Sequence, residues 1–348
     1  MKHPLFLVAA TALACQLLVS CEPKPGTTGR GAAPPPGVPE SGWKVTLQSS
    51  SWRISGFQAD KDLSGIAAWD AGHCLICTDE GRLIQSGIMD RGAHRISAAT
   101  TIQLLPGMPG EKEADAEGVA VSHEEGCYYV TGSHGVGKKK GEFQESRCQV
   151  VRIPIDRTTG EPRQDGVRYA SLMPWVRSNP ELAKYAGQPL QMNGFNIEGL
   201  TMKGGKLWFG VRGPNENGDA FVIEAEPQSI FNGTPAARLH RLKVGPLQGI
   251  REIAALKNGF LILTGNACAE PSKEFPTSLA PPHDQTFRFY FWNPGGSPST
   301  TFVGDLPSPS AKAEGVLVLE DAADHIDVLV IFDGASGGGP KAYRLTKS

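Results

Sequence analysis

The chain has 348 residues, a formal net charge of −2 at pH 7 and 40% hydrophobic residues. Nearly balanced charge leaves no electrostatic footprint for nucleic acid, so we expect no nucleic-acid partner. After residue 20, no apolar run is long enough to cross a membrane as a helix.

The N-terminal segment has the features of an export signal. Residues 1–20 contain the apolar stretch LFLVAATALA and end in LVS, directly before Cys21. LVSC resembles the lipobox of bacterial lipoproteins, in which a diacylglycerol is attached to the cysteine sulfur. An ordinary signal peptide with an incidental cysteine is the alternative. We expect lipid attachment at Cys21 and a location in the bacterial cell envelope, on the periplasmic face of the outer membrane.

Residues 21–42 are rich in proline and glycine. Such a segment buries too little apolar surface to fold, so we expect an extended tether. Residues 43–348 then form one domain, for which we expect a monomer.

A short pattern recurs within this domain. An apolar strand begins at a polar residue, and a second strand ends at another polar residue 14 to 19 residues later. The five copies occupy residues 64–79, 117–134, 198–212, 251–266 and 314–333. Internal similarity at a period of roughly 50 residues is typical of propellers. Further apolar runs after each copy complete four strands per unit, so the sequence predicts an all-β, five-bladed β-propeller.

The last unit lacks a fourth strand. The segment WKVTLQ at 43–48 is the natural candidate to complete it, which would close the ring and cover two sheet edges. A sixth blade, hidden near residues 52–58 or in the insertion at 173–191, is the alternative.

If the fold is a propeller, the repeat predicts which residues meet at one end of the channel. In each blade the first strand lines the channel and the second runs back beside it, so first-strand starts and second-strand ends share one mouth. A concave site lined by convergent polar groups is the usual form of a ligand pocket. Ten polar residues are therefore expected at that mouth: Ser64, Asp79, Glu117, His134, Glu198, Arg212, Arg251, Asn266, Glu314 and Asp333.

The charges at these positions allow three interpretations. Crowded carboxylates favour a cation, and oxygen ligands suit Ca²⁺ or Mg²⁺, with Glu117, Glu198 and Glu314 as the metal candidates. Alternatively, Arg212 and Arg251 pair with the glutamates in a dry lattice of salt bridges. The Glu-Gly steps can also be purely structural.

Three residues are candidates for chemistry. His134, between glycines in GSHG, could act as a general base or a metal ligand, or be an ordinary turn histidine. Arg212 suits an anionic group because its planar fork matches carboxylate or phosphate. Glu198 is the third residue predicted as a catalytic candidate.

Two cysteines could form a disulfide. Cys127 and Cys148 open neighbouring strands of an expected hairpin and lie equally far from its centre, so they could face each other.

The segments EADAEGVAV…YYVTGSHG, NIEGL…LWFGVRGP, GIREIAAL…FLILTG and AEGVLVL…VIFDG resemble the domain-of-unknown-function 3616 family. The resemblance covers most of residues 60–345 and implies no established activity. The EG openings are more distantly similar to esterase-like phytase propellers, which suggests calcium and phosphoesters by analogy. The first and fourth copies of the repeat have Ser64 and Arg251 at the position where the other three have glutamate, so the sequence lacks a complete ring of glutamates.

Three functions remain open at this point, and so does whether the protein is an enzyme. The first is a cell-envelope propeller that binds a small polar or anionic ligand at the channel mouth, with a divalent cation as one means. The second is a metal-assisted hydrolase of phosphoesters or esters. The third is a protein–protein scaffold whose channel is structural.

Overall fold

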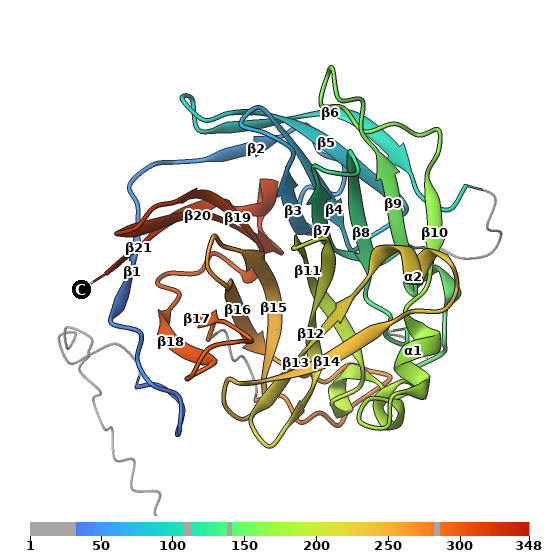
Figure 1. Ribbon diagram of the computed structural model, residues 1–348, viewed down its shortest axis with the longest axis vertical. Helices are drawn as coiled ribbons and strands as arrows, with labels where there is room; N and C mark the ends of the chain where they lie inside the picture. The colour runs from blue at the N-terminus through green and yellow to red at the C-terminus, as the bar shows by residue number, and fades with distance from the viewer. Residues whose placement is uncertain (1–32, 107–112, 138–140, 282–285, 348) are drawn as a thin grey trace, which may run out of the picture. The chain divides into compact units, whose positions relative to one another are not determined.

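The computed structural model describes residues 33–106, 113–137, 141–281 and 286–347. The expected signal peptide, Cys21 and most of the expected tether lie outside these residues. Within them, the strands form five small sheets arranged as the blades of a propeller (Figure 1). This confirms the predicted all-β, five-bladed fold. Among the described residues, no helix is long and apolar enough to cross a membrane.

Each blade is a four-stranded antiparallel sheet, and blade 1 has one additional strand. Blade 1 contains β3 (Leu63–Ala68), β4 (His73–Thr78), β5 (Leu83–Asp90) and β6 (Arg95–Gln103). Blade 2 contains β7 (Ala116–Ser122), β8 (Cys127–Gly132), β9 (Val150–Pro154) and β10 (Arg168–Ala170). Blade 3 contains β11 (Asn196–Lys203), β12 (Lys206–Glu216), β13 (Asp219–Ala225) and β14 (Ala237–Lys243). Blade 4 contains β15 (Gln248–Ala255), β16 (Phe260–Asn266), β17 (Arg288–Trp292) and β18 (Thr300–Asp305).

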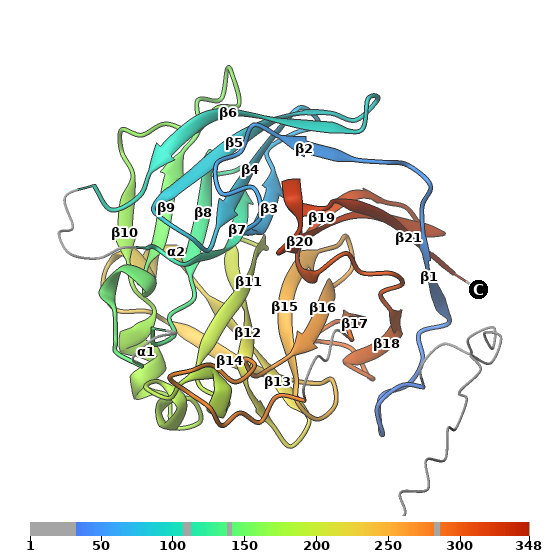
Figure 2. The same cartoon turned by 180° about the vertical axis from the view of Figure 1, so that it is seen from behind.

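Blade 5 closes the ring with both ends of the described chain. Its strands, from the inside outward, are β19 (Lys312–Asp321), β20 (His325–Asp333), β21 (Lys341–Lys347) and β1 (Trp43–Leu47). The register pairs Trp43 with Lys347 and Leu47 with Tyr343, and both ribbon views show β1 beside β21 (Figures 1 and 2). The N-terminal strand therefore completes the last blade, as the sequence predicted.

The innermost strands β3, β7, β11, β15 and β19 each contact the next, and β19 returns to β3. Glycines allow this close approach. A Cβ on Gly118 would lie 2.8 Å from the Glu198 carbonyl oxygen, and one on Gly199 would lie 2.8 Å from the Ile253 backbone nitrogen. The glycine of the repeated Glu-Gly step is thus explained by packing between neighbouring blades.

The blades are buried on both faces because each is sandwiched between two neighbours. Strands such as β8 and β16 are therefore apolar at nearly every position instead of alternating. Apolar clusters fill the spaces between successive blades. The one between blades 2 and 3, which includes Tyr129 and Phe209, also packs against the helix α1 (Met173–Ser178).

The expected location of a sixth blade contains other structures. Residues Arg53–Ser55 form β2, which pairs in parallel with β6 as the fifth strand of blade 1. The insertion at 173–191 is helical, with α1 followed by the 3-10 helices Ala183–Tyr185 and Leu190–Met192. A second helix, α2 (Pro227–Phe231), lies between β13 and β14.

The folded body begins earlier than residue 43. Val38 is buried in the core between blades 3 and 4, and Glu40 forms a parallel bridge with Phe302 at the edge of blade 4. Phe302 also donates a backbone hydrogen bond of 2.8 Å to Pro39. The last part of the expected tether is therefore docked, because a valine and an open strand edge offer it partners.

The expected Cys127–Cys148 disulfide is wrong. The β8–β9 register pairs Cys127 with Pro154 and Thr131 with Val150, so Cys148 lies beyond the other end of the ladder. No disulfide joins the two cysteines. The prediction assumed a loop that is symmetric about its centre. The loop between β8 and β9 is asymmetric, because the 3-10 helix Glu145–Arg147 occupies its second half, so residues equally far from its centre do not face each other.

Candidate functional site

The predicted first-strand residues share one structural device, a break in the strand register. In β11, Ile197 pairs with Val211 and Gly199 with Gly210, so Glu198 has no partner opposite it. The same shift skips Glu117 in β7, Arg251 in β15, Glu314 in β19 and Ser64 in β3. Such β-bulges re-aim side chains, and here they occur where each innermost strand begins.

One cavity of about 430 Å³ collects most of the predicted residues. Ser64 and His134 do not line it. The other eight do, namely Asp79, Glu117, Glu198, Arg212, Arg251, Asn266, Glu314 and Asp333. The helical insertion contributes Gln191, and the segment after β16 contributes Cys268 and Glu270. These two segments touch, because the Leu279 N–H donates to the Gln191 carbonyl at 3.0 Å.

Glu198 lies between two arginines. Arg212 Nη1 donates to Glu198 Oε1 at 2.7 Å, and Arg251 Nε lies 2.9 Å from Glu198 Oε2. Arg212 also donates to the backbone carbonyls of Asn266 and Cys268, at 3.1 and 3.3 Å. Each nitrogen of the Arg212 guanidinium therefore makes one hydrogen bond, and both carboxylate oxygens of Glu198 lie within ion-pair distance of an arginine.

Arg251 connects this pair to blade 5. Its Nη2 donates to Glu314 Oε1, and its side chain is only 3% exposed. Burial opposes the charge on Arg251, but Glu198 and Glu314 outweigh that effect and raise its pKa. Blades 3, 4 and 5 thus join through an ion-pair network, which is the lattice interpretation of the sequence. Two of the three predicted metal ligands, Glu198 and Glu314, belong to this network.

The remaining side of the cavity is acidic. Glu117 is 7% exposed, and it has no hydrogen bond or ion pair with any residue that the structure describes. Burial, followed by the charges of Asp115 and Glu198, raises its pKa well above the usual range of a glutamate. Asp79 and Asp333 line the same cavity, and Lys312 Nζ lies 2.8 Å from Asp333 Oδ2.

His134 is buried away from the cavity, which contradicts its predicted catalytic role. It adopts a positive φ of 55°, and its Nδ1 lies 2.8 Å from the Gly132 carbonyl oxygen. Its Nε2 accepts the Leu172 N–H at 3.3 Å, so Nδ1 carries the proton. Burial lowers the pKa of His134 to about 4. The ring is therefore neutral at pH 7 and bonds two backbone groups.

Three charged residues near the mouth were not predicted from the sequence, and each lies two positions before a first-strand residue. They are Asp62, Asp115 and Lys312. Asp115 forms a buried ion pair with Arg147, which itself lines the cavity. Residues i and i−2 of a strand share a face, so reading each strand start two residues further back would have found this set.

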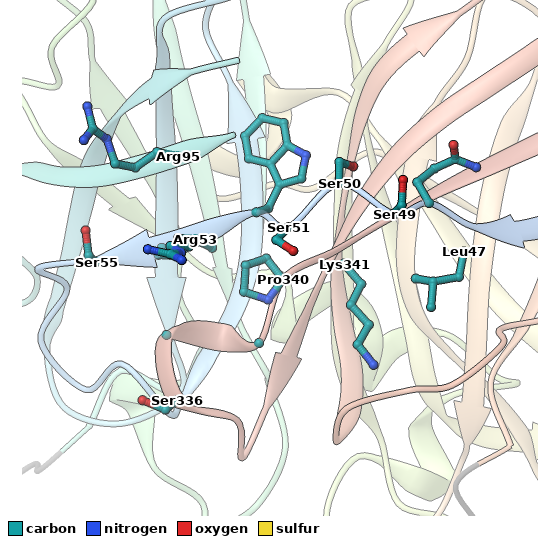
Figure 3. Close-up of a pocket in the computed structure, with 15 residues that line it drawn as sticks. Leu47, Ser49, Ser50, Ser51, Arg53, Ser55, Arg95, Ser336, Pro340 and Lys341 are labelled. Carbon is teal, nitrogen blue, oxygen red and sulfur yellow. The ribbon is translucent and has the colours of Figure 1, made fainter. Parts of the chain in front are cut away.

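A larger and more open pocket of about 710 Å³ lies elsewhere, where the chain passes from blade 5 to blade 1. Figure 3 shows Arg53 and Arg95 on one side of it and Lys341 on the other. Its serines and exposed basic side chains include none of the predicted site residues. The 430 Å³ cavity is therefore the candidate site.

The comparisons with known proteins bear on family and fold. A model of the family described as "Protein of unknown function (DUF3616)" matches residues 158–273, which confirms the resemblance over blade 3 and the inner half of blade 4. The matched segment contains Glu198, Arg212, Arg251 and Asn266. A comparison with curated proteins gave no match.

Solved structures similar to this chain include two enzymes. Virginiamycin B lyase from Staphylococcus aureus has 13% identity and a TM-score of 0.38, over 87% of this chain and 99% of that one. An exo-β-1,3-galactanase from Phanerochaete chrysosporium has 8% identity and a TM-score of 0.48, over 86% of this chain and 64% of that one. At these scores neither activity transfers to this chain.

Proposed function

We propose that this protein is a ligand-binding propeller whose channel mouth takes a small polar ligand, with a divalent cation linking the ligand to the carboxylates. One observation carries the proposal. Arg212 and Arg251 of the 430 Å³ cavity are paired with Glu198 and Glu314, and Arg147 with Asp115. Glu117 is buried in the same cavity without a hydrogen bond or ion pair among the described residues. An anion that binds Arg212 or Arg251 directly would compete with the charges of Glu198 and Glu314.

The test is a binding experiment with defined probes. Inorganic phosphate, succinate and glucose are titrated into the protein by calorimetry, each with and without Ca²⁺. We expect one probe to bind, more tightly with Ca²⁺, and its binding to weaken in Glu117→Gln. Glu320→Gln, an exposed change on β19 outside the cavity, is the matched control. If no probe binds, or Glu117→Gln binds as the control does, the proposal fails.

A structural role is the second candidate, and the ion-pair network favours it. Arg251 and its two glutamates fill the side of the mouth formed by blades 3 to 5, as expected if the channel only holds the blades together. If the channel is only structural, no probe binds to the wild type, and Arg251→Met lowers the free energy of unfolding. The hydrolase alternative loses one of its predicted bases, because both ring nitrogens of His134 bond backbone groups, and a glutamate remains as the other.

We also propose that the protein is a lipoprotein of the cell envelope, anchored through Cys21. The support is the apolar segment that ends in LVSC. Cys21→Ser should abolish labelling with a radioactive or clickable fatty acid and move the protein into the soluble envelope fraction. Labelling that persists in this variant would exclude the anchor.

A further inference from the structure

Three aspartates meet where blade 1 joins blade 5. Asp62 precedes β3, Asp79 follows β4, and Asp333 ends β20. One carboxylate oxygen from each aspartate lies within 4.8 Å of those of the other two. Ca²⁺ binds oxygen at about 2.3–2.6 Å, so two ligands on opposite sides of the ion are roughly 4.8 Å apart. The spacing fits three oxygens around a single ion.

Backbone hydrogen bonds hold the three aspartates in this arrangement. The Asp79 N–H donates to the Asp62 carbonyl at 3.2 Å. Gly334, next to Asp333, donates its N–H to the Lys61 carbonyl at 2.7 Å and so ties blade 5 to blade 1. Little reorganisation is needed to bring the carboxylates together, which favours binding.

Glu117 provides an independent indication of a ligand. Its side chain is more than nine-tenths buried and lines the same cavity as Asp79 and Asp333. None of the described residues gives it a hydrogen bond or an ion pair. It is close enough to Asp79 for that charge to contribute to its raised pKa. A buried carboxyl group without a partner ionises only at a cost in free energy, and a cation on the cavity side of the aspartates would favour its ionised form.

Lys312 shows that this position already attracts positive charge. Its ammonium lies 2.8 Å from Asp333 Oδ2, although the lysine side chain itself is 62% exposed. A lysine is a single charge on a flexible stem, so it can leave the aspartates for solvent. An incoming metal ion would compete with it for Asp333.

We propose that Asp62, Asp79 and Asp333 hold a Ca²⁺ ion at the seam between blades 1 and 5, where the ion displaces Lys312. Glu117 lines the same cavity as two of the three ligands, Asp79 and Asp333. Ca²⁺ suits the site because every protein ligand is a carboxylate oxygen and water can complete the shell, whereas Mg²⁺ demands a tighter octahedron. This inference rests on the proposed function, since it gives the cation of that proposal its location.

The test is calorimetric titration of Ca²⁺ into the full chain after treatment with a chelator. We expect one ion to bind, and Asp62→Asn and Asp333→Asn to weaken binding at least about tenfold, because each removes a charged ligand. Lys312→Met should tighten binding about threefold, as expected for loss of a partly exposed ion pair. Glu320→Gln should bind as the wild type does. It is the matched control because Glu320, His325 and Asp327 form the other group with metal-ligand spacing among the described residues.

Three results would overturn the inference. They are no Ca²⁺ binding by the wild type, wild-type affinity in Asp62→Asn, or an affinity in Lys312→Met no higher than that of the wild type. If Asp333→Asn misfolds, the result for Asp62→Asn is used instead. The Asp62 side chain has no hydrogen bond or ion pair within the described residues, so its replacement should not disturb the fold. The two proposals fail separately. Ca²⁺ binding without any probe binding rejects only the proposed function. Probe binding that Asp62→Asn leaves unchanged rejects only this site.

Discussion

The two sides of the channel mouth are built by the same strand bulges but hold different charges. On the side of blades 3 to 5, Glu198, Arg251 and Glu314 alternate in sign and bond one another. On the side of blades 1 and 2, Glu117 and Asp79 face Asp333, and Lys312 is the partly exposed cation beside them. On the first side the charged groups pair with one another, whereas on the second Glu117 has no hydrogen bond or ion pair among the described residues.

One residue accounts for most of this difference. Arg251 occupies the bulge position that holds glutamate in blades 2, 3 and 5. It supplies the positive charge that blades 3 and 5 require, whereas blade 1 has the uncharged Ser64 at the same position. Arg251, which departs from the glutamate of the other blades, is thus the residue that pairs the glutamates of blades 3 and 5.

Removing Arg251 should have the largest effect. Arg251→Met leaves Glu198 and Glu314 buried with a lost partner, so we expect the free energy of unfolding to fall by about 3–5 kcal/mol. Chemical denaturation measures the change. The matched control is Arg163→Met, which removes an exposed pair with Asp165 and should leave the free energy of unfolding nearly unchanged. Equal losses in both variants would contradict the network.

His134 should make the fold sensitive to acid. Its pKa is about 4 in the folded protein, below the ordinary histidine value of 6.5, so the unfolded chain binds the extra proton first as the pH falls. The stabilisation is complete above pH 6.5 and is lost progressively towards pH 4, on the order of 3 kcal/mol in total. His134→Gln should flatten the dependence of the unfolding free energy on pH. The exposed His123→Gln should not, and identical slopes in both variants would exclude a buried neutral imidazole.

Glu198→Gln should destabilise the protein by about 2 kcal/mol, because it leaves Arg212 and Arg251 with an uncharged partner. The loss should be smaller than that of Arg251→Met, since Arg212 keeps two backbone carbonyls and Arg251 keeps Glu314. Thermal and chemical unfolding of the purified variant measure it. Unchanged stability would show that the Glu198 pairs contribute nothing net.

The same chemical change on the acidic side should cost almost nothing. Glu117→Gln removes a carboxyl group that has no partner among the described residues and whose raised pKa already favours its neutral form. We expect stability to be retained to within about 0.5 kcal/mol. The difference between Glu198→Gln and Glu117→Gln, measured under identical conditions, is the direct test of the contrast between the two sides. A loss at Glu117 as large as that at Glu198 would remove the contrast.

The repeat, the blade count, the closure by residues 43–48 and eight of the ten mouth residues could all be predicted from the chain. These features depend on local signals, namely strand periodicity and polar residues at strand ends, which recur once per blade. The predicted position of His134 and the predicted Cys127–Cys148 pair were wrong because His134 and Cys148 lie in the long β8–β9 connection. There the path of the backbone depends on a 3-10 helix and on neighbouring segments rather than on a repeat.

The amino-acid sequence by itself determined which strands line the channel and which polar side chains gather at its mouth, because strand order and direction follow from the repeat. Only the tertiary structure decided which of those charges are paired. Glu117 and Glu198 have the same local sequence context, an acid followed by glycine at the start of an apolar strand. Glu198 meets Arg212 and Arg251, whereas Glu117 meets other carboxylates. Contacts between blades, made by residues far apart in the chain, set that difference.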